Sequence, residues 1–598
     1  MFSLKSSRLR ARPTLGFARQ AVAAIVLAGF APAQTPPPSA SLDAAAQAAE
    51  RQQREEQDRQ REQLRRVRQS AEPAPSIEGA LPLPKVKAPA MARHDIRELK
   101  IHGADHMRPA FRQQLIKEFS GRSMGVEELE RLMSEITRHY VARGFVTTRV
   151  YVPTQDLSTG TLRILVVEGK VERLETKGVA SHVFPAAAGE LLNLRDLEQG
   201  IDNLNRLPSH QATLDLLPGA EPGSSVVAIR DVRSRPWRLS YSADNTGSEA
   251  TGRHSASVTV GADDLLGFAE AVSVTHRRSV PYRSDRQASE STNGSVSVPF
   301  GYQTFTLGGS MSSYAMMLET PAQLLPMDGA NWSLFSRVDR TLYRGQKGRL
   351  GAYGTLTWKA GRNYLRGKPI GPTSRDATTV EVGLNYATPL AGGFGSVDAS
   401  LAQGLAIFGA LEDGPARRTV APRNQFFAFK FNASWSRKFA TGDLPLIFAS
   451  ALNGQWTDEV LFGSDQLTIG GLYAVRGFDR SNLSGDRGVV WRNDLSTTVP
   501  ILKDAAGGAK FSARPYVGLD LGYAGSNYYE KTQPNPANPT QQIREFAGPS
   551  GTLMGAAAGL GLMRGPLNAD IFYARALHRA GGMTPESGRT YLRFNGSF

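Results

Sequence analysis

The chain has 598 residues, which is more than one ordinary soluble core accommodates, so two or more folded units are expected. It contains no cysteine, which excludes disulfides and thiolate metal sites, and its formal net charge is +15. The mean hydropathy is −0.30 and no run of about 18 apolar residues occurs. These features exclude a membrane-spanning helix but not a β-barrel, whose strands alternate apolar and polar residues.

Residues 1–33 have the three parts of a secretory signal peptide. Basic residues from Lys5 to Arg19 precede the apolar stretch AVAAIVLAGF at 21–30, and the small-residue sequence APA follows at 31–33. The alternative is a short buried helix. We expect export, with cleavage after about Ala33. Export argues against a cytoplasmic nucleic-acid-binding role in spite of the positive charge.

Residues 34–69 contain a predicted helix, from about residue 41, that is polar on every side. It has no Gly or Pro, and acid-first pairs such as Glu50–Arg54 lie four residues apart. Such a helix cannot dock on an apolar core. It is either a solvated spacer or a helix lodged in a wet, charged channel, and its residues leave both interpretations open. Residues 70–93 follow as a Pro-rich, extended linker.

Two small α+β units are predicted next, at 94–170 and 171–233. In the first, HDIRELKIHG alternates like a strand, two stretches with helical spacing follow, and the β-branched runs FVTTRVYVP and TLRILVVEG end it. The second repeats a shorter version of this order around LRDLEQGIDNLNRLP. Exposed sheet edges in such units can accept an added strand from a partner, although two plain compact domains explain the composition equally well.

Residues 234–598 read as alternating strands without helical spacing. In WRLSYSADN, Trp237, Leu239 and Tyr241 alternate with polar residues, and similar alternation recurs as far as YLRFNGSF. Short links such as RGQKG at 344–348 interleave with long polar ones at 361–377 and 526–551. Short turns at one end and long loops at the other indicate a membrane β-barrel rather than a soluble sandwich. The length suits an even number of strands in the mid-teens.

No catalytic constellation or cofactor motif is found in the sequence. GPSGT at 548–552 fails the nucleophile pattern G-x-S-x-G, and GRNYLRGKP at 361–369 has the wrong spacing for a phosphate loop. His102 and His106 are four residues apart, but they lie at a strand end and turn, where we expect a solvated pair rather than a metal site. We therefore expect no enzymatic activity, no cofactor and no bound metal.

Five motifs then occur in one order along the chain. They are GFVTTRVYVPTQDLSTGTLRILVVEGKVE at 144–172, LEQGIDNLNRLP at 197–208, SADNTGSEATGR at 242–253, VRGF at 475–478 and GLDLG at 518–522. Together they resemble the TpsB-type outer-membrane transporters of two-partner secretion, the FhaC/ShlB/HecB haemolysin secretion and activation family of the Omp85 superfamily. The resemblance implies an N-terminal plug helix, two periplasmic POTRA domains at 94–170 and 171–233, and a sixteen-stranded outer-membrane barrel.

The resemblance also identifies residues from about 463 to 488 as a sixth extracellular loop that folds back into the pore. Its motif is Val475, Arg476, Gly477 and Phe478, and its strand partners are Asp520, Gly518 and Gly522. The resemblance implies that Arg476 pairs with Asp520, and strand alternation allows Asp520 to face the lumen. Without it, Arg476 would be taken for a solvated loop charge. Gly518 departs from the family, because many members place a bulkier residue there.

The same resemblance implies the partners. A cognate TpsA-type exoprotein would be captured unfolded by the POTRA domains and reach the surface without ATP. The barrel assembly machinery would read Phe594 and Phe598 as a C-terminal signal, and outer-membrane lipid and lipopolysaccharide would surround the barrel. No nucleic acid is expected. The alternatives are an Omp85-type factor that inserts other barrels, a passive porin and an uptake receptor. The sequence does not identify the cargo.

Overall fold

The computed structural model describes residues 45, 48–49, 92–176, 178–320, 323–345, 348–414, 421–442, 444–503, 509–527, 530–535, 538–546 and 550–598. The predicted signal peptide lies outside the described residues, as does the predicted linker before residue 92. Of the predicted plug helix, only Ala45, Ala48 and Ala49 are described, and all three are helical. Within the described residues, no helix is long and apolar enough to cross a membrane.

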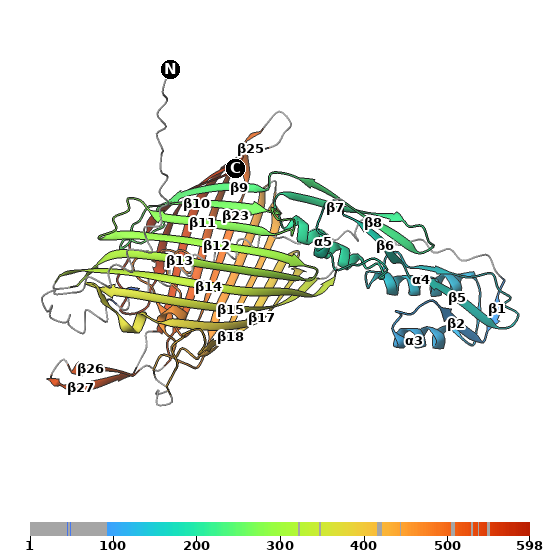
Figure 1. Cartoon of the computed structure of the whole chain (residues 1–598), viewed down its shortest axis with the longest axis horizontal. Coiled ribbons are helices and arrows are strands. Elements are labelled where there is room, and N and C mark those ends of the chain that lie inside the picture. The colour runs from blue at the N-terminus through green and yellow to red at the C-terminus, as the bar shows by residue number, and fades with distance from the viewer. Residues whose placement is uncertain are drawn as a thin grey trace, which may run out of the picture. The chain divides into compact units, whose positions relative to one another are not determined.

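The first α+β unit packs two helices on a small sheet (Figure 1). Its elements are β1 (His94–Ile96), β2 (Glu98–His102), α3 (Pro109–Phe119), β3 (Arg122–Met124), α4 (Val126–Val141), β4 (Arg149–Tyr151) and β5 (Thr161–Val167). The sheet has the order β2-β5-β4, with β2 and β5 parallel. The predicted helical spacing is confirmed in α4, where Leu129, Leu132, Ile136 and Tyr140 are completely buried.

Residues 94–103, which alternate like one strand, are divided between two strands in the structure. The chain breaks at Arg97, so that β1 pairs with β3 in a separate two-stranded sheet while β2 pairs with β5. The backbone N–H groups of Arg97 and Glu98 both donate to the Gly160 carbonyl, which holds this change of sheet. A three-residue strand such as β3 has too little sequence to show a period of its own.

The second unit repeats the plan with one α-helix. It comprises β6 (Lys170–Glu175), the 3₁₀ turn η2 (Ser181–Val183), α5 (Leu194–Asn205), β7 (His210–Pro218) and β8 (Ser224–Arg233), in the sheet order β6-β8-β7. The Asn193 side chain caps α5 by accepting from the Arg195 N–H. One face of α5 buries Leu197, Ile201 and Leu204 against this sheet.

Sixteen strands close a β-barrel within the described residues (Figure 1), which confirms the predicted fold. They are β9 (Trp237–Asp244), β10 (Ser255–Asp263), β11 (Ala271–Ser279), β12 (Gln287–Phe300), β13 (Gln303–Glu319), β14 (Leu324–Gly345), β15 (Gly348–Leu365), β17 (Asp376–Leu390), β18 (Gly393–Leu405), β19 (Phe427–Thr441), β20 (Leu444–Trp456), β23 (Arg487–Thr497) with its continuation β24 (Val499–Lys503), β25 (Ala509–Gly525), β28 (Ser550–Arg564), β29 (Leu567–His578) and β30 (Arg589–Ser597). Antiparallel pairing of β30 with β9 completes the barrel.

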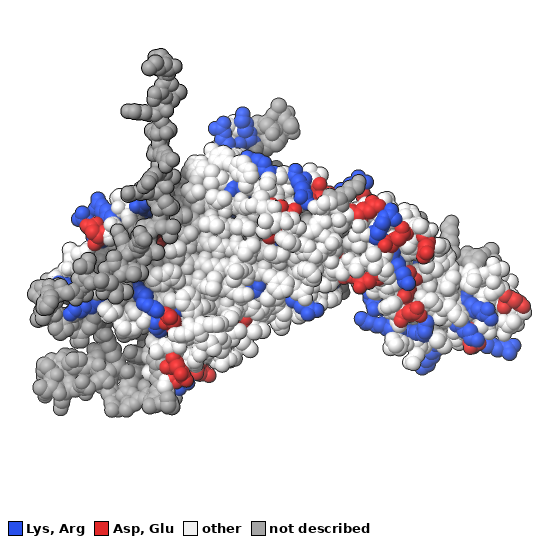
Figure 2. Space-filling view, in the orientation of Figure 1, with Lys and Arg blue, Asp and Glu red and all other residues white. Residues whose placement is uncertain are grey.

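Strand alternation gives the barrel an apolar outer face. Five apolar side chains are exposed, and polar residues such as Arg238, Ser257 and Arg593 alternate with them: Trp237 and Leu239 on β9, Val258 and Val260 on β10, and Leu592 on β30. Figure 2 shows that the visible barrel face carries few charged side chains between its two ends. An apolar band of this kind is what a bilayer requires of a spanning barrel.

The links follow the predicted pattern of short turns and long loops, with one correction. Turns such as 301–302, 391–392 and 565–566 join strands at one end, and long connections such as 406–426 join them at the other. The stretch 361–377, predicted to be a loop, lies partly in β15, which runs to Leu365 and is followed by β16 (Lys368–Pro369) and η3 (Gly371–Thr373). Its polar residues remain in the strand because their backbone pairs with β14.

The long segment after β25 contains a hairpin that the sequence analysis did not foresee. β26 (Glu530–Asn535) and β27 (Asn538–Phe546) form a separate two-stranded sheet. This hairpin carries several polar residues and prolines, so composition alone had indicated a plain loop.

Candidate functional site

The connection between β20 and β23, residues 457–486, is the segment predicted to fold into the pore, and we call it loop 6. The expected limits of about 463–488 are displaced, because β20 ends at Trp456 and β23 begins at Arg487. The short strands β21 (Leu467–Thr468) and β22 (Ser484–Gly485) pair with each other. They bring the two arms of loop 6 together and leave residues 469–483 as its tip.

Arg476 lies at this tip and makes a bidentate contact with Asp520 on β25. Its Nε is 2.6 Å from Asp520 Oδ2 and its Nη2 is 2.6 Å from Oδ1, while its backbone N–H donates to Oδ2 at 2.9 Å. Both residues are buried, with 4% of Arg476 and none of Asp520 exposed. A charge-assisted, two-point contact away from solvent fixes both the position and the direction of the arginine.

A second carboxylate completes the arginine's surroundings. Asp494 on β23 lies 2.8 Å from Arg476 Nη1, and Arg492 lies 3.8 Å from Asp520. Sequence reasoning missed Asp494, which pairs in register with Gly518 of β25. The available signal was weak, because only the register of β23 against β25 shows that this aspartate faces the same point of the lumen as Asp520.

Glycines make room for the tip of loop 6 against the wall. A Cβ at Gly518 would lie 2.2 Å from Arg476 Nη2, and one at Gly522 would lie 2.8 Å from a Val475 methyl group. On β28, a Cβ at Gly555 would lie 1.8 Å from the carbonyl oxygen of Arg476. The departure from the family at Gly518 therefore has a local consequence, because the absent side chain leaves space for the guanidinium.

The other two motif residues shape the tip and anchor it by apolar contact. Gly477 has φ +99°, which favours glycine, and a Cβ there would lie 2.2 Å from the Arg575 backbone. Phe478 is buried in an apolar cluster whose other members are Ile469, Ala474, Val475, Leu483, Val490, Ala524, Leu553 and Ala580. The structure thus brings the predicted motif and its strand partners together at one point of the inner wall.

Phe594 and Phe598 lie away from this point, where β30 pairs with β9 and closes the barrel; we call this pairing the seam. Phe598 exchanges two backbone hydrogen bonds with Leu239 of β9, at 2.8 and 3.0 Å. Its ring stacks on Tyr241 at 6.1 Å between centroids, and the Phe594 ring lies 5.9 Å from the same tyrosine. Both phenylalanines are exposed on the outer face.

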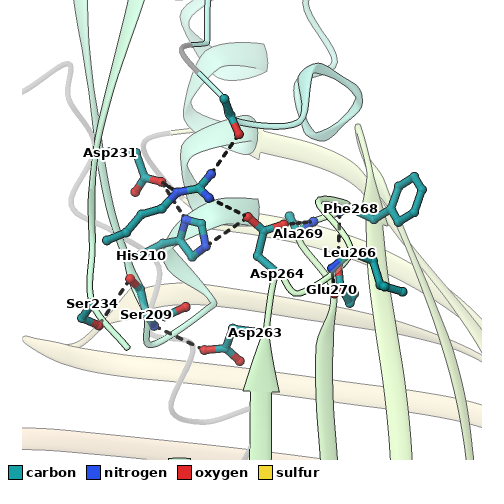
Figure 3. Close-up of polar contacts among 12 residues, drawn as sticks. Ser209, His210, Asp231, Ser234, Asp263, Asp264, Leu266, Phe268, Ala269 and Glu270 are labelled. Carbon is teal, nitrogen blue, oxygen red and sulfur yellow. Dashed lines mark hydrogen bonds and ion pairs between the residues drawn. The ribbon is translucent and has the colours of Figure 1, made fainter. Parts of the chain in front are cut away.

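A second polar site joins the second α+β unit to the barrel at the turn between β10 and β11. His210 of β7 lies between two carboxylates, with Nδ1 2.8 Å from Asp231 and Nε2 3.5 Å from Asp264 of the turn (Figure 3). Arg233 contacts the same two carboxylates, at 2.9 and 3.3 Å. The imidazole and both carboxylates are buried, so this is a fixed joint rather than a solvated surface pair.

Helix α5 and the residue after it reinforce this joint through contacts with this and other turns of the barrel. Arg344 at the end of β14 contacts both Glu198 and Asp202 on α5. Asn203 donates to the Gly301 carbonyl at 2.7 Å, and Arg206 donates to the carbonyls of Ala269 and Ser297. No local sequence pattern predicts these contacts, because each joins residues far apart in the chain.

The histidines of HGADH do not form a shared site. His106 Nδ1 contacts Glu168 at 2.7 Å, and the Tyr140 hydroxyl donates to the same carboxylate at 2.6 Å. Burial opposes ionisation of Glu168, but hydrogen bonds from Tyr140 and His106 outweigh it and lower the pKa of this carboxyl. His102 is exposed at the end of β2. Among the described residues, no group of three or more His, Asp and Glu is arranged to hold a metal ion.

Comparisons with known proteins agree with this architecture. Residues 223–562 match the family described as "Haemolysin secretion/activation protein ShlB/FhaC/HecB". Residues 94–169 match the ShlB-type POTRA domain, and 167–218 match a POTRA domain. The chain belongs to this family. It is accordingly an outer-membrane transporter of two-partner secretion, with its POTRA domains in the periplasm.

Individual relatives support the assignment along most of the chain. The outer membrane transporter CdiB-2 of Burkholderia pseudomallei is 32% identical over 69% of this chain and 70% of its own length. The hemolysin transporter protein ShlB of Serratia marcescens is 31% identical over 66% and 69%. The solved structure of CdiB from Escherichia coli matches with a TM-score of 0.78 and 26% identity, covering 95% of this chain and 100% of that one.

Proposed function

We propose that this transporter captures an unfolded cognate exoprotein of the TpsA type through its POTRA domains and passes it through the barrel to the cell surface without ATP. It is not an enzyme in this proposal. The exoprotein would fold outside the cell, and folding there would prevent its return.

The observation that carries the proposal is the contact between the tip of loop 6 and the barrel wall. A buried arginine is held in two-point contact with a wall aspartate, beside glycines that leave room for it. Separating a buried ion pair costs several kcal/mol unless new partners are found. The contact therefore defines one position of loop 6, seated on the wall, and the proposal adds a second position, shifted to widen the path of the exoprotein.

The sheet edges of the POTRA domains support capture of an extended chain. In the sheet β2-β5-β4 the edge strand β4 carries Tyr151, which is 52% exposed. In the sheet β6-β8-β7 the strand β7 carries Leu217, also exposed. An unfolded segment can add to such an edge through backbone hydrogen bonds, while exposed apolar side chains select its sequence.

The proposal includes the route by which the transporter reaches its membrane. Residues 1–33 would direct export and be removed. The barrel assembly machinery would recognise the strand that carries Phe594 and Phe598, and lipopolysaccharide would contact the apolar outer face in the finished membrane. Arg476 and Asp520 would act after assembly, in the transport cycle.

The test is secretion of the cognate exoprotein, in cells that carry Arg476→Ala, Asp520→Ala or the unchanged protein. Arg286→Ala is a matched control, because it removes an exposed arginine from another connection, that between β11 and β12. Outer-membrane levels are measured in parallel. We expect both loop 6 variants to reach the membrane while exoprotein in the medium falls at least about tenfold, and the control to secrete normally.

Unchanged secretion by both loop 6 variants would limit the contact to a structural role. The Omp85-type assembly alternative makes a different prediction. It requires that the unchanged protein exports nothing and that other barrels fail to assemble in its absence.

A further inference from the structure

We propose that loop 6 has a second anchor, the Glu586 carboxylate, which holds the loop tip independently of the contact between Arg476 and Asp520. Glu586 lies in the connection between β29 and β30, residues 579–588. The family motif does not include it. The inference rests on the proposed function in one respect, namely that loop 6 shifts during transport.

The geometry of this anchor is a carboxylate in a cradle of backbone N–H groups. Asp479 and Arg480 donate to Glu586 Oε2 at 2.7 and 3.0 Å, and Ser481 donates to Oε1 at 2.7 Å. Three consecutive amides thus converge on one carboxylate and use both of its oxygens. Successive N–H groups that point to one side form a concave anion site, and the negative charge strengthens each hydrogen bond.

The side chains around this cradle add contacts from neighbouring segments. Arg589, at the start of β30, pairs with Asp479 and donates to the Asn245 carbonyl. Arg480 pairs with Glu249 of the connection between β9 and β10 at 2.7 Å, but both side chains are at least half exposed. An exposed pair of this kind contributes little. The Arg589–Asp479 pair is largely buried, so it supports the same segment beside the Glu586 carboxylate.

The two anchors act on different groups and come from different parts of the barrel. The inner anchor binds residue 476 from β23 and β25, and the outer anchor binds residues 479–481 from the connection after β29. Among the described residues, the hydrogen bonds of the inner anchor and those of the outer anchor share no residue. Loss of either anchor should therefore leave the tip held by the other anchor and by the apolar contacts of Phe478.

The test is amide hydrogen exchange in the purified full-length protein, because both anchors hold backbone N–H groups of loop 6. Four variants are compared with the unchanged protein: Glu586→Gln, Glu586→Asp, Asp520→Ala, and Asp520→Ala combined with Glu586→Gln. Glu412→Gln, an exposed carboxylate of the connection between β18 and β19, is the matched control. The Asp variant retains the charge but withdraws the carboxylate by one methylene group.

We expect Glu586→Gln and Glu586→Asp to speed exchange at residues 479–481 about tenfold or more while residue 476 stays slow. Asp520→Ala should speed exchange at residue 476 and change residues 479–481 less than about twofold. The double variant should speed exchange across the whole tip by more than the two single effects combined. The control should match the unchanged protein.

Two results would overturn the proposal. One is unchanged exchange at residues 479–481 in both Glu586 variants, and the other is equal acceleration there by Asp520→Ala alone and by the double variant. Secretion measured on the same variants separates this inference from the proposed function. If exchange follows expectation but the double variant secretes normally, the second anchor stands and the proposed role of loop 6 fails.

Discussion

At the scale of single residues, the position of loop 6 on the barrel wall depends on glycines as much as on the ion pair. Arg476 can approach two wall aspartates because Gly518 leaves its guanidinium space, and the loop backbone can approach β28 because Gly555 has no Cβ. Only glycine, which has no Cβ, lets two backbone segments come this close. Contact, charge and free space therefore act together at one point of the wall.

Gly555→Ala should displace the loop tip without breaking an ion pair. The added methyl group would lie 1.8 Å from the carbonyl oxygen of Arg476. Because this carbonyl belongs to the backbone and cannot rotate away, the strain should cost about 1–3 kcal/mol. We expect faster amide exchange at residues 476–481 and reduced secretion, with normal barrel assembly. Gly561→Ala on the same strand is the control, because its Cβ would meet nothing closer than 3.5 Å. Equal exchange in the two variants would show that the space at Gly555 has no role.

The sequence was sufficient for some of these residues and not for others. The contact between Arg476 and Asp520 was expected from the family motif, and the alternation of β25 supplied its direction. Asp494 and Glu586 were not expected, because each reaches loop 6 from a segment distant in the chain. Their positions depend on strand register and loop conformation, which no local pattern reports.

At the scale of elements, sequence periodicity predicted the long helices and strands and missed the short strands. The apolar face of α4 and the alternation of β9 and β10 were evident, since each repeats a period several times. The three-residue strands β1 and β3, and the hairpin β26–β27, carry no such repeat. The joint between α5, β7 and the barrel turn could not be predicted from the sequence either, because its polar residues resemble solvated surface groups.

Asp264→Asn should loosen this joint. Its Oδ1 accepts from the Ala269 N–H, and an amide oxygen can keep that bond, but the amide N–H₂ would then face the Arg233 guanidinium, which is also a donor. Loss of the charge-assisted contact with Arg233, whose side chain is partly exposed, should weaken the joint by about 1 kcal/mol. Asp285→Asn, an exposed aspartate of the connection between β11 and β12, is the control.

The measurement is the distance distribution between spin labels on cysteines introduced at exposed Gln211 of β7 and exposed Leu390 of β17. The chain has no cysteine of its own, so only these two positions are labelled. Asp264→Asn should broaden the distribution relative to the control. Identical distributions would mean that the remaining contacts, including those of Arg344 with α5, hold the joint alone.

At the scale of the whole molecule, closure of the barrel depends on one pair of strands that are far apart in sequence. The register of β30 against β9 runs from Arg593 opposite Asp244 to Ser597 opposite Ser240, which is a shorter pairing than either strand makes with its other neighbour. Chain length and alternation indicated an even barrel in the mid-teens, and the family resemblance supplied sixteen. Neither reveals how short the closing pair is.

Phe598→Ala should therefore reduce the amount of folded barrel in the outer membrane more than loss of an ordinary lipid-facing phenylalanine. The backbone bonds to Leu239 can remain, but the stack on Tyr241 is lost, and such an aromatic pair contributes about 0.5–1.5 kcal/mol beyond its buried area. The matched variant is Phe305→Ala on β13, which removes an exposed phenylalanine away from the seam. Heat-modifiable migration of outer-membrane fractions measures the folded barrel. Equal losses in the two variants would show that the ring serves only as lipid-facing surface and that the seam closes without it.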